Sequence, residues 1–251
     1  MSEQKEWVVV VGATGAFGSV MVERFVQRGL GVLAVARRVE ALAALAEKYP
    51  GLRPCAADIS TDAAVDTIRQ AIPGPVRMVV HGPGVAVGGG VLTIDTAALV
   101  DAVNIKVGGF IRLVRAVDTH LLPNSRLVAI GGHYGFEPTA YAAAAGVGNA
   151  ALVNVVRQLS LAYGERGITA HLVAPGPADT ERLRRVAADR ARLQGTTVES
   201  VLESIKADSS LHAFTEPGQV AWALEMLLAP EASAMTGSSL MLDAGRRRGL
   251  P

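Results

Sequence analysis

The feature that most constrains the fold of this chain is a regular alternation of short apolar runs with longer segments of helical spacing. The first run, Trp7–Val11, reads Trp-Val-Val-Val-Val, the continuous apolar pattern of a strand that is buried on both faces. Repeated strand–helix units join parallel strands through right-handed crossovers. The expected strands are Trp7–Val11, Val32–Val35, Pro54–Ala56, Val76–Val80, Arg126–Ile130, Thr169–Val173 and Ser239–Leu242.

The helical segments between these runs complete the prediction of one α/β domain over residues 1–251. No linker or internal repeat divides the chain, so we expect a single doubly wound parallel sheet of Rossmann type, with three layers in the order α/β/α. The expected helices are Ser19–Arg28, Val39–Lys48, Asp62–Ala71, Thr96–Leu121, Ala142–Tyr163 and Val220–Leu228.

A charged helical insertion, Glu181–Ser210, lies between the sixth strand and the last helix. In a doubly wound sheet such an insertion lies over the carboxyl ends of the strands, where ligands bind. We therefore expect residues 181–212 to form a substrate lid. A solvated surface hairpin is the alternative.

The composition excludes several classes of partner. The chain has 24 basic and 23 acidic residues, which gives no electrostatic case for nucleic acid or an anionic membrane. Five histidines and one cysteine show no metal-ligand spacing, so no metal site is expected. The lone Cys55, the polar start Met1–Glu6 and the lack of a membrane-length apolar run predict a cytoplasmic protein. Its expected partner is a small molecule.

A glycine-rich loop follows the first expected strand and opens the first expected helix. Glycines there permit a tight turn, and backbone amides at the helix N-terminus can bind a pyrophosphate. The strand before the loop and the helix after it make this a strong sign of dinucleotide binding. The loop residues expected to contact the cofactor are Gly12, Thr14, Gly15, Ala16, Phe17 and Gly18.

The end of the second expected strand indicates which dinucleotide is bound. NAD-selective domains place an acidic residue there, but this chain has Ala36 followed by Arg37 and Arg38. Alanine leaves room for a 2′-phosphate, and a guanidinium can bind that phosphate with two hydrogen bonds. We expect NADP (NADPH), with NAD less favoured. The alternative is that the arginines only cover the surface, Arg38 more so than Arg37.

Taken together, these motifs resemble the short-chain dehydrogenase/reductase family over almost the full length of the chain. The middle glycine of the loop falls one residue earlier than in the commonest family form. The resemblance implies cofactor contacts by the adenine-side pair Asp58 and Ile59, by Gly82 and Pro83 after the fourth strand, and by Pro175, Gly176 and Thr180 beside the nicotinamide. Asn104 matches the family asparagine that kinks the long helix and holds a water. Thr236-Gly237 and Asp243-Ala244-Gly245 match the C-terminal family signature.

The family's serine, tyrosine and lysine are not found at the matching positions. Gly148-Asn149-Ala150-Ala151-Leu152 aligns without gaps to the family's Ser-Lys-Ala-Ala-Leu helix, which puts Ala145 in the tyrosine position and Asn149 in the lysine position. Counting back thirteen residues from Ala145 gives Gly132 for the serine. We reject the other register, which makes Tyr141 the family tyrosine. Asn149 can still bind the ribose hydroxyls.

Two residues are the leading candidates for a replacement proton donor. Tyr141 lies four residues before Ala145 and shares its helix face if the helix begins that early. His133 follows the serine position and could donate a proton near neutral pH without tuning. The alternative is a purely structural role for each residue: packing at the helix start for Tyr141, and a solvated or backbone-bonded loop position for His133. The expected catalytic set is Asn104, Tyr141, His133 and Asn149.

Three functions remain open at this point. The first is an NADP(H)-dependent oxidoreductase for a carbonyl, imine or enone with a non-standard proton donor. The second is a catalytically inactive NADP-binding sensor or partner protein, and the third is a non-redox lyase or isomerase on the same scaffold. The family resemblance also implies a homo-dimer or homo-tetramer.

Overall fold

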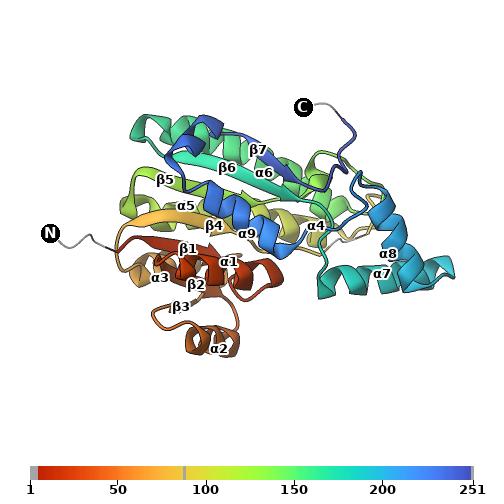
Figure 1. The fold of residues 1–251 in the computed structure, drawn as a ribbon, viewed down its shortest axis with the longest axis horizontal. Helices are drawn as coiled ribbons and strands as arrows, with labels where there is room; N and C mark the ends of the chain where they lie inside the picture. The colour runs from red at the N-terminus through yellow and green to blue at the C-terminus, as the bar shows by residue number, and fades with distance from the viewer. Residues whose placement is uncertain (1–4, 87–88, 250–251) are drawn as a thin grey trace.

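A single parallel sheet of seven strands forms the centre of the molecule, in the order β3-β2-β1-β4-β5-β6-β7 (Figure 1). The structure is a computed structural model that describes residues 5–86 and 89–249. It confirms the doubly wound α/β prediction, with the strand order reversing between β1 and β4. The strands are β1 (Trp7–Val11), β2 (Gly31–Ala36), β3 (Arg53–Ala56), β4 (Val76–His81), β5 (Leu121–Ile130), β6 (Thr169–Pro175) and β7 (Ser239–Leu242).

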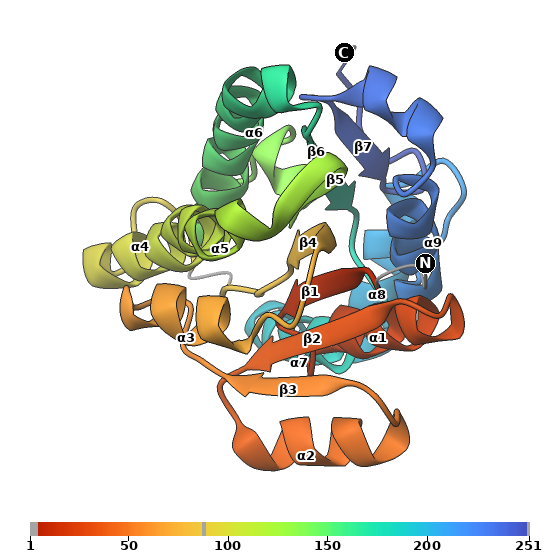
Figure 2. The same cartoon turned by 90° about the vertical axis from the view of Figure 1, so that its left-hand side faces the viewer.

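Helices cover both faces of this sheet (Figure 2). One face carries α3, α5 and α6, and the other carries α1, α2 and α9. Within the described residues no helix is both long and apolar enough to cross a membrane. The α-helices are α1 (Ala16–Gln27), α2 (Val39–Lys48), α3 (Ala63–Ala71), α4 (Thr96–Val103), α5 (Gly109–Val117), α6 (Ala143–Tyr163), α7 (Glu181–Gln194), α8 (Val198–Ala207) and α9 (Pro217–Met226).

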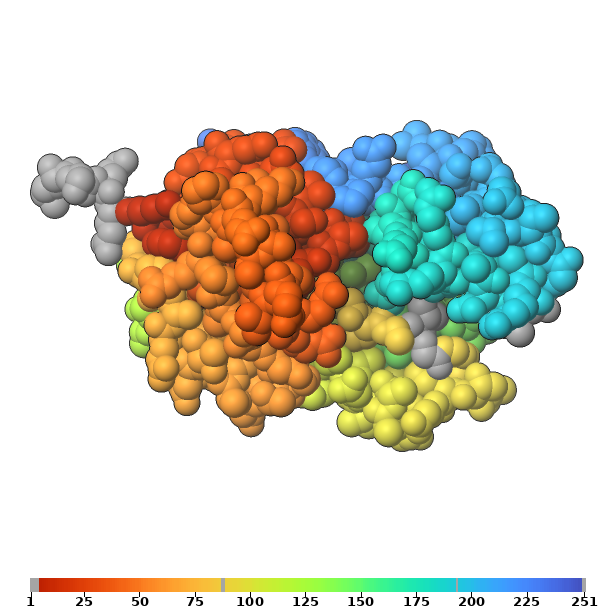
Figure 3. Space-filling model, turned by 90° about the horizontal axis from the view of Figure 1, so that it is seen from below, coloured from red at the N-terminus to blue at the C-terminus, as the bar shows by residue number. Residues whose placement is uncertain are grey.

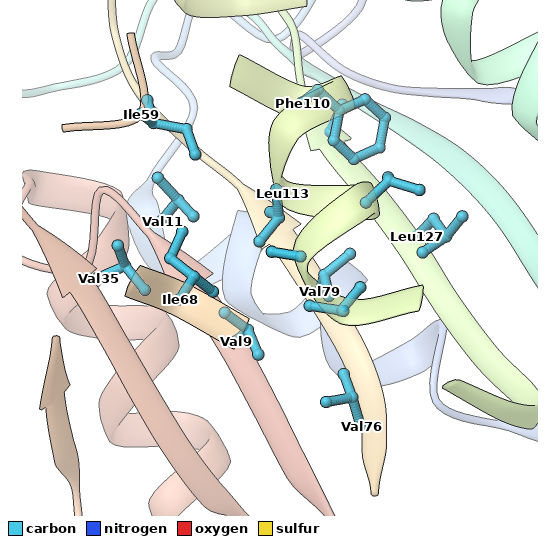
Figure 4. Packing of buried hydrophobic residues seen from close by; sticks show 14 of the residues in the cluster. Val9, Val11, Val35, Ile59, Ile68, Val76, Val79, Phe110, Leu113 and Leu127 are labelled. Atoms are coloured by element: carbon cyan, nitrogen blue, oxygen red, sulfur yellow. The ribbon is translucent and has the colours of Figure 1, made fainter. Parts of the chain in front are cut away.

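Strand β1 is apolar at every position because both of its faces are buried. Val9 of β1 packs with Val79 and Leu113 on the face covered by α5 (Figure 4), whereas Val8 and Val10 pack on the opposite face. All of these side chains are fully buried. Burying a valine or leucine contributes about 1.5–3 kcal/mol, so the alternation of faces along one strand fixes its register.

The long helix expected over Thr96–Leu121 is interrupted. A π-helical turn, Asn104–Gly108, separates α4 from α5, and a 3-10 turn (Asp118–His120) leads directly into β5. A π-helical turn contains an additional residue, so it rotates the side chains before it relative to those after it. This interruption changes where Asn104 and Lys106 point.

The loops that follow the strands all gather at the carboxyl edge of the sheet. Helices α7 and α8 lie beyond this edge and form a lobe of their own. Figure 3 shows this lobe in cyan and light blue, with a hollow between it and the amino-terminal part of the chain. The fold therefore brings the glycine-rich loop and the inserted helices to the same side of the molecule.

We predict that Gly18→Ala lowers the free energy of unfolding by about 1–3 kcal/mol, the usual effect of overpacking. A Cβ at Gly18 would overlap the Gly12 carbonyl oxygen and lie 2.8 Å from the Ala13 Cα, and backbone atoms cannot move aside cheaply. Urea unfolding of the purified variant measures the change. Gly218→Ala in α9 is the control, because nothing lies within 4 Å of its Cβ and alanine favours a helix. Equal stabilities of the two variants would contradict this account.

Candidate active site

The glycine-rich loop lies in the crevice where the strand order reverses. Gly12 has a φ of +85°, and a Cβ there would lie 3.2 Å from the Gly82 carbonyl carbon. Only glycine combines this left-handed backbone with so close an approach between the loops after β1 and β4. The two loops therefore form a shallow cradle of backbone atoms.

The N-terminus of α1 opens onto this cradle. Gly15 precedes the helix without a side-chain cap, and Gly15 and Ala16 are exposed to solvent. The first amides of the helix are therefore available to an anion, and the helix dipole favours negative charge there. Thr14 and Phe17 are half-buried beside them.

Two arginines follow β2 at the same edge. Ala36 is buried, whereas Arg37 and Arg38 are exposed, and neither forms an ion pair with another described residue. Arg38 is the residue that precedes α2. The pKa of Asp58 is lowered chiefly by hydrogen bonds from the Ser60 backbone N–H and hydroxyl, and more weakly by Arg37. The end of β2 thus presents positive charge and no carboxylate of its own.

The remaining residues expected at the cofactor lie along the same edge. Gly82 and Pro83 follow β4, Ile59 is buried after β3, and Pro175 ends β6. Gly176 packs against Asp243, where a Cβ would lie 2.9 Å from the Asp243 Cα. Thr180 is the N-cap of α7, and its hydroxyl accepts a hydrogen bond from the Leu183 N–H (3.3 Å).

The three positions that the sequence alignment assigns to the family's serine, tyrosine and lysine lie around the exit of β5. A Cβ at Gly132 would be 2.9 Å from the Asn149 Nδ2, so the expected serine and lysine positions are neighbours. Ala145 is buried one turn earlier on α6. The Asn149 Oδ1 is buried and accepts no hydrogen bond from any described residue. A buried amide oxygen without a donor fits a ribose hydroxyl that approaches from the crevice.

The Asn104 side chain contacts other groups of the protein. Its Nδ2 donates to the Ser60 carbonyl (2.9 Å), and its Oδ1 accepts from the Arg112 guanidinium (2.9 Å). Both partners are on the α3 and α5 side of the sheet. The π-helical turn that begins at Asn104 interrupts the long helix where a kink was expected. The expected role of Asn104 in holding a water stays a prediction.

The structure contradicts the expectation that His133 needs no tuning to donate a proton near neutral pH. Its side chain is buried in a 3-10 turn, where burial and then the charge of Arg246 lower its pKa to about 4. The imidazole is therefore neutral at pH 7. The charged groups that influence it belong to the C-terminal segment, to its own loop and to the end of α8: Arg246, Asp243, Glu137 and Asp208.

Tyr141 reaches the site from a loop instead of a helix. The expected helix begins at Ala143, because Ala142 forms an isolated bridge with Gly89 and has a non-helical backbone conformation, with a ψ of 50°. The Tyr141 hydroxyl is hydrogen-bonded to the Tyr134 hydroxyl (2.8 Å), and the two rings meet edge to face. Burial, followed by this hydrogen bond, raises the pKa of Tyr134, so its phenol stays protonated at neutral pH.

A cavity of about 770 Å³ opens beside Tyr141. Its floor is the loop after β4, and its roof is one face of α7. The lining residues are Gly84, Val85, Ala86, Gly89, Tyr141, Arg182, Arg185, Val186, Asp189, Arg190 and Gln194. The cavity is large enough for a small-molecule substrate.

The sequence reasoning missed Lys106. Its side chain is buried against Gly148 of α6, and its Nζ donates to the Ile130 carbonyl (2.9 Å), two residues before Gly132. Burial and then the charge of Arg182 lower its pKa to about 8. An ammonium group thus lies at the end of β5, on a side chain that packs against the residue before Asn149. The available signal was a single charge inside the apolar stretch Val103–Val107.

Comparison with known proteins identifies the class. A family profile described as enoyl-(acyl carrier protein) reductase matches residues 12–247. The chain belongs to the short-chain dehydrogenase/reductase family and is of the oxidoreductase class. The described residues contain no group of three or more histidine, cysteine or acidic side chains that could hold a metal ion.

Individual relatives share about a quarter of their residues with this chain. A cyclic-di-GMP-binding biofilm dispersal mediator protein of Escherichia coli is 26% identical, over 94% of each chain. A putative ketoacyl reductase of Streptomyces coelicolor is 24% identical, over 97% of this chain and 98% of the relative.

Two solved structures illustrate the similarity of fold. A variant of actinorhodin polyketide ketoreductase with NADPH has a TM-score of 0.88 at 22% identity, covering 96% of this chain and 97% of the other. An NADPH-bound short-chain oxidoreductase of Pseudomonas aeruginosa PAO1, described as containing an atypical catalytic center, has a TM-score of 0.84 at 22% identity and covers 98% of both chains.

We predict that Lys106→Met flattens part of the pH dependence of stability. Between pH 8 and 10.5 the unfolded chain binds more protons at Lys106 than the folded chain does, so wild-type stability rises with pH in this window. Over this window the free energy of unfolding of the wild type rises by about 3 kcal/mol relative to that of the variant. Urea unfolding across this range measures it, with exposed Lys48→Met as the control. Parallel stability curves for wild type and Lys106→Met would show that the ammonium is not desolvated.

Proposed function

We propose that this chain is an NADP(H)-dependent oxidoreductase that acts on a carbonyl, imine or enone of a small molecule. The observation that carries the proposal is the glycine cradle at the reversal of strand order, which opens onto the free N-terminus of α1. Arg37 at the end of β2 favours the 2′-phosphate of NADP over the free ribose hydroxyl of NAD. The NADPH-bound structures of similar fold support the same cofactor.

Different residues along the carboxyl edge of the sheet would bind different parts of the cofactor. Gly12, Gly15 and the first amides of α1 would bind the pyrophosphate, and Asn149 would accept a hydrogen bond from a ribose hydroxyl at its unpaired Oδ1. Pro175 and Thr180 would lie beside the nicotinamide. When bound, this cofactor supplies or accepts the hydride, and the protein must orient the substrate and manage the proton.

Tyr141 is the residue that we propose as the proton donor. Gly132, Ala145 and Asn149 have no group that titrates, whereas the Tyr141 phenol lines the cavity. Tyr134 can donate its own proton to the Tyr141 oxygen at 2.8 Å, which would stabilise the charge that Tyr141 develops as it gives up its proton. Residues 181–212 would cover the substrate from above as a lid.

A second candidate function has a specific observation in its favour. Three neighbouring positions lack the reactive side chains of the family, as in a protein that binds a dinucleotide without turning over a substrate. The relative from Escherichia coli is described as a cyclic-di-GMP-binding mediator, so a signalling role occurs among the relatives. A non-redox lyase or isomerase is less well supported, because the cofactor cradle is kept.

We also propose a homo-dimer or homo-tetramer, as the family resemblance implies. Val100 of α4 and Val147 and Leu161 of α6 are large apolar side chains that remain exposed on the single chain. Association of α4 and α6 with a second copy would bury them.

For the cofactor, we expect NADPH to bind more tightly than NADH, and Arg37→Ala to weaken NADPH by roughly tenfold or more while NADH changes little. A charge-assisted hydrogen bond contributes about 1.5–3 kcal/mol, and a tenfold change in affinity corresponds to about 1.4 kcal/mol. Titration calorimetry with both cofactors measures the ratio. Arg53→Ala is the matched control, because Arg53 begins β3 whereas Arg37 follows the end of the parallel strand β2. If neither cofactor binds the wild type, the proposed function is wrong.

For the proton donor, we expect Tyr141→Phe to reduce turnover by about 10²–10⁴-fold, the usual contribution of general acid catalysis. NADPH affinity should be unchanged, because Tyr141 lies outside the cradle. Tyr134→Phe should have a smaller effect, and His133→Gln little effect. Steady-state NADPH oxidation with a panel of carbonyls, imines and enones measures all three. A wild-type protein that binds NADPH yet oxidises it with no member of the panel would favour the non-catalytic function.

A further inference from the structure

Helix α7 carries two kinds of arginine. Arg184 is paired with Asp179 (3.0 Å) and Arg192 with Asp189 (3.1 Å). The other three arginines, at positions 182, 185 and 190, line the cavity, and none forms an ion pair with a described carboxylate. The arginines outside the cavity are therefore paired with carboxylates, whereas the arginines that line the cavity are not.

The sole acidic residue among the described cavity-lining residues leaves the lining basic. Asp189 is bound by Arg192, and its side chain is 70% exposed. Counting Arg182, Arg185 and Arg190 against Asp189, the lining has a net charge of +2. A concave site with one sign of charge concentrates ligands of the opposite sign.

Two of the unpaired arginines are held in place near the proposed proton donor. An Nη atom of Arg182 donates to the Val85 carbonyl, and the other Nη would lie 2.7 Å from a Cβ at Gly84. Arg190 lies over the Tyr141 ring, 4.9 Å from its centroid. Their positions are set by neutral partners, so their guanidinium groups keep donors for a ligand.

The rest of the lining is apolar. Val85 and Ala86 form part of the floor, and Val186 lies between the arginines on α7. This surface suits the hydrocarbon body of a ligand, while the arginines suit a carboxylate or phosphate at one end. The cavity thus combines apolar side chains and unpaired arginines, and the Tyr141 phenol lines the same cavity.

We propose that the substrate is an anion: an oxo compound with an apolar body and a carboxylate or phosphate group that binds Arg182, Arg185 and Arg190. This inference rests on the proposed function and adds the class of substrate to it. The same three arginines could instead bind the phosphates of the cofactor. The experiment must therefore separate an anionic substrate from an anionic cofactor.

The first test is binding by calorimetry, with pairs of non-reactive probes that differ only in charge: butyrate, benzoate and 2-naphthoate against their primary amides. At least one carboxylate should bind tenfold or more tightly than its amide. Arg185→Ala and Arg190→Ala should each remove most of this preference. Two control variants should change it less than twofold: Arg184→Ala, on the same helix but outside the cavity, and Arg53→Ala, at the start of β3. No preference in any pair, or an equal loss in the control variants, overturns the proposal.

The second test uses NADPH affinity in the same four variants. If the arginines bind the substrate, NADPH affinity stays within about threefold of the wild type in Arg185→Ala and Arg190→Ala. If those variants lose NADPH affinity and keep the carboxylate preference, the arginines bind the cofactor phosphates, and this inference is wrong while the proposed function stands. If the wild type binds the carboxylates but not NADPH, the proposed function fails and the anion site remains.

Discussion

The candidate site depends on one close approach of backbone to backbone, between the loops after β1 and β4. Gly12 makes this approach in a left-handed conformation, with the Gly82 carbonyl carbon 3.2 Å from where its Cβ would be. Because β1 and β4 are neighbours with crossovers in opposite directions, the loops that follow them border a crevice at the carboxyl edge of the sheet. The sheet then places α6, the end of β6 and α7 around this crevice. A side chain at Gly12 would separate the two loops and disturb every part of the site that is built on them.

Strong local patterns predicted most of the fold. The ranges Trp7–Val11, Val39–Lys48 and Ser239–Leu242 agree with the structure to the residue. The first half of β5 could not be predicted, since Pro123 and a left-handed Asn124 are unfavourable in a strand. Long-range contacts hold that segment in the sheet instead, including the hydrogen bond from the Ser125 hydroxyl to the Val76 carbonyl (2.7 Å).

The site was predictable only where one motif supplies the geometry. The glycine-rich loop and the arginine pair after β2 could be identified because each lies within one strand–loop–helix unit. The contact between Tyr134 and Tyr141 spans seven residues of irregular loop, which has no repeating pattern in the sequence. The helix boundary at Ala143 was also missed, because a bridge to Gly89 from another loop sets it. Alanines have high helix propensity, so local reasoning extends the helix one residue further back.

The proposed absence of the family's serine, tyrosine and lysine and the charged cavity can be understood together. General acid catalysis typically contributes about 10²–10⁴ in rate, whereas orientation of a bound substrate can contribute about 7–11 kcal/mol. A site that has lost its general acid can therefore remain catalytic if it still orients the bound substrate. Guanidinium groups suit that task, because their hydrogen bonds to a carboxylate or phosphate are directional and paired. In this arrangement α7 holds the anionic end of the substrate, and the reacting carbon is positioned by its distance from that end. The proton donor can then belong to a loop, because the precision comes from the arginines and the cofactor cradle on either side of it.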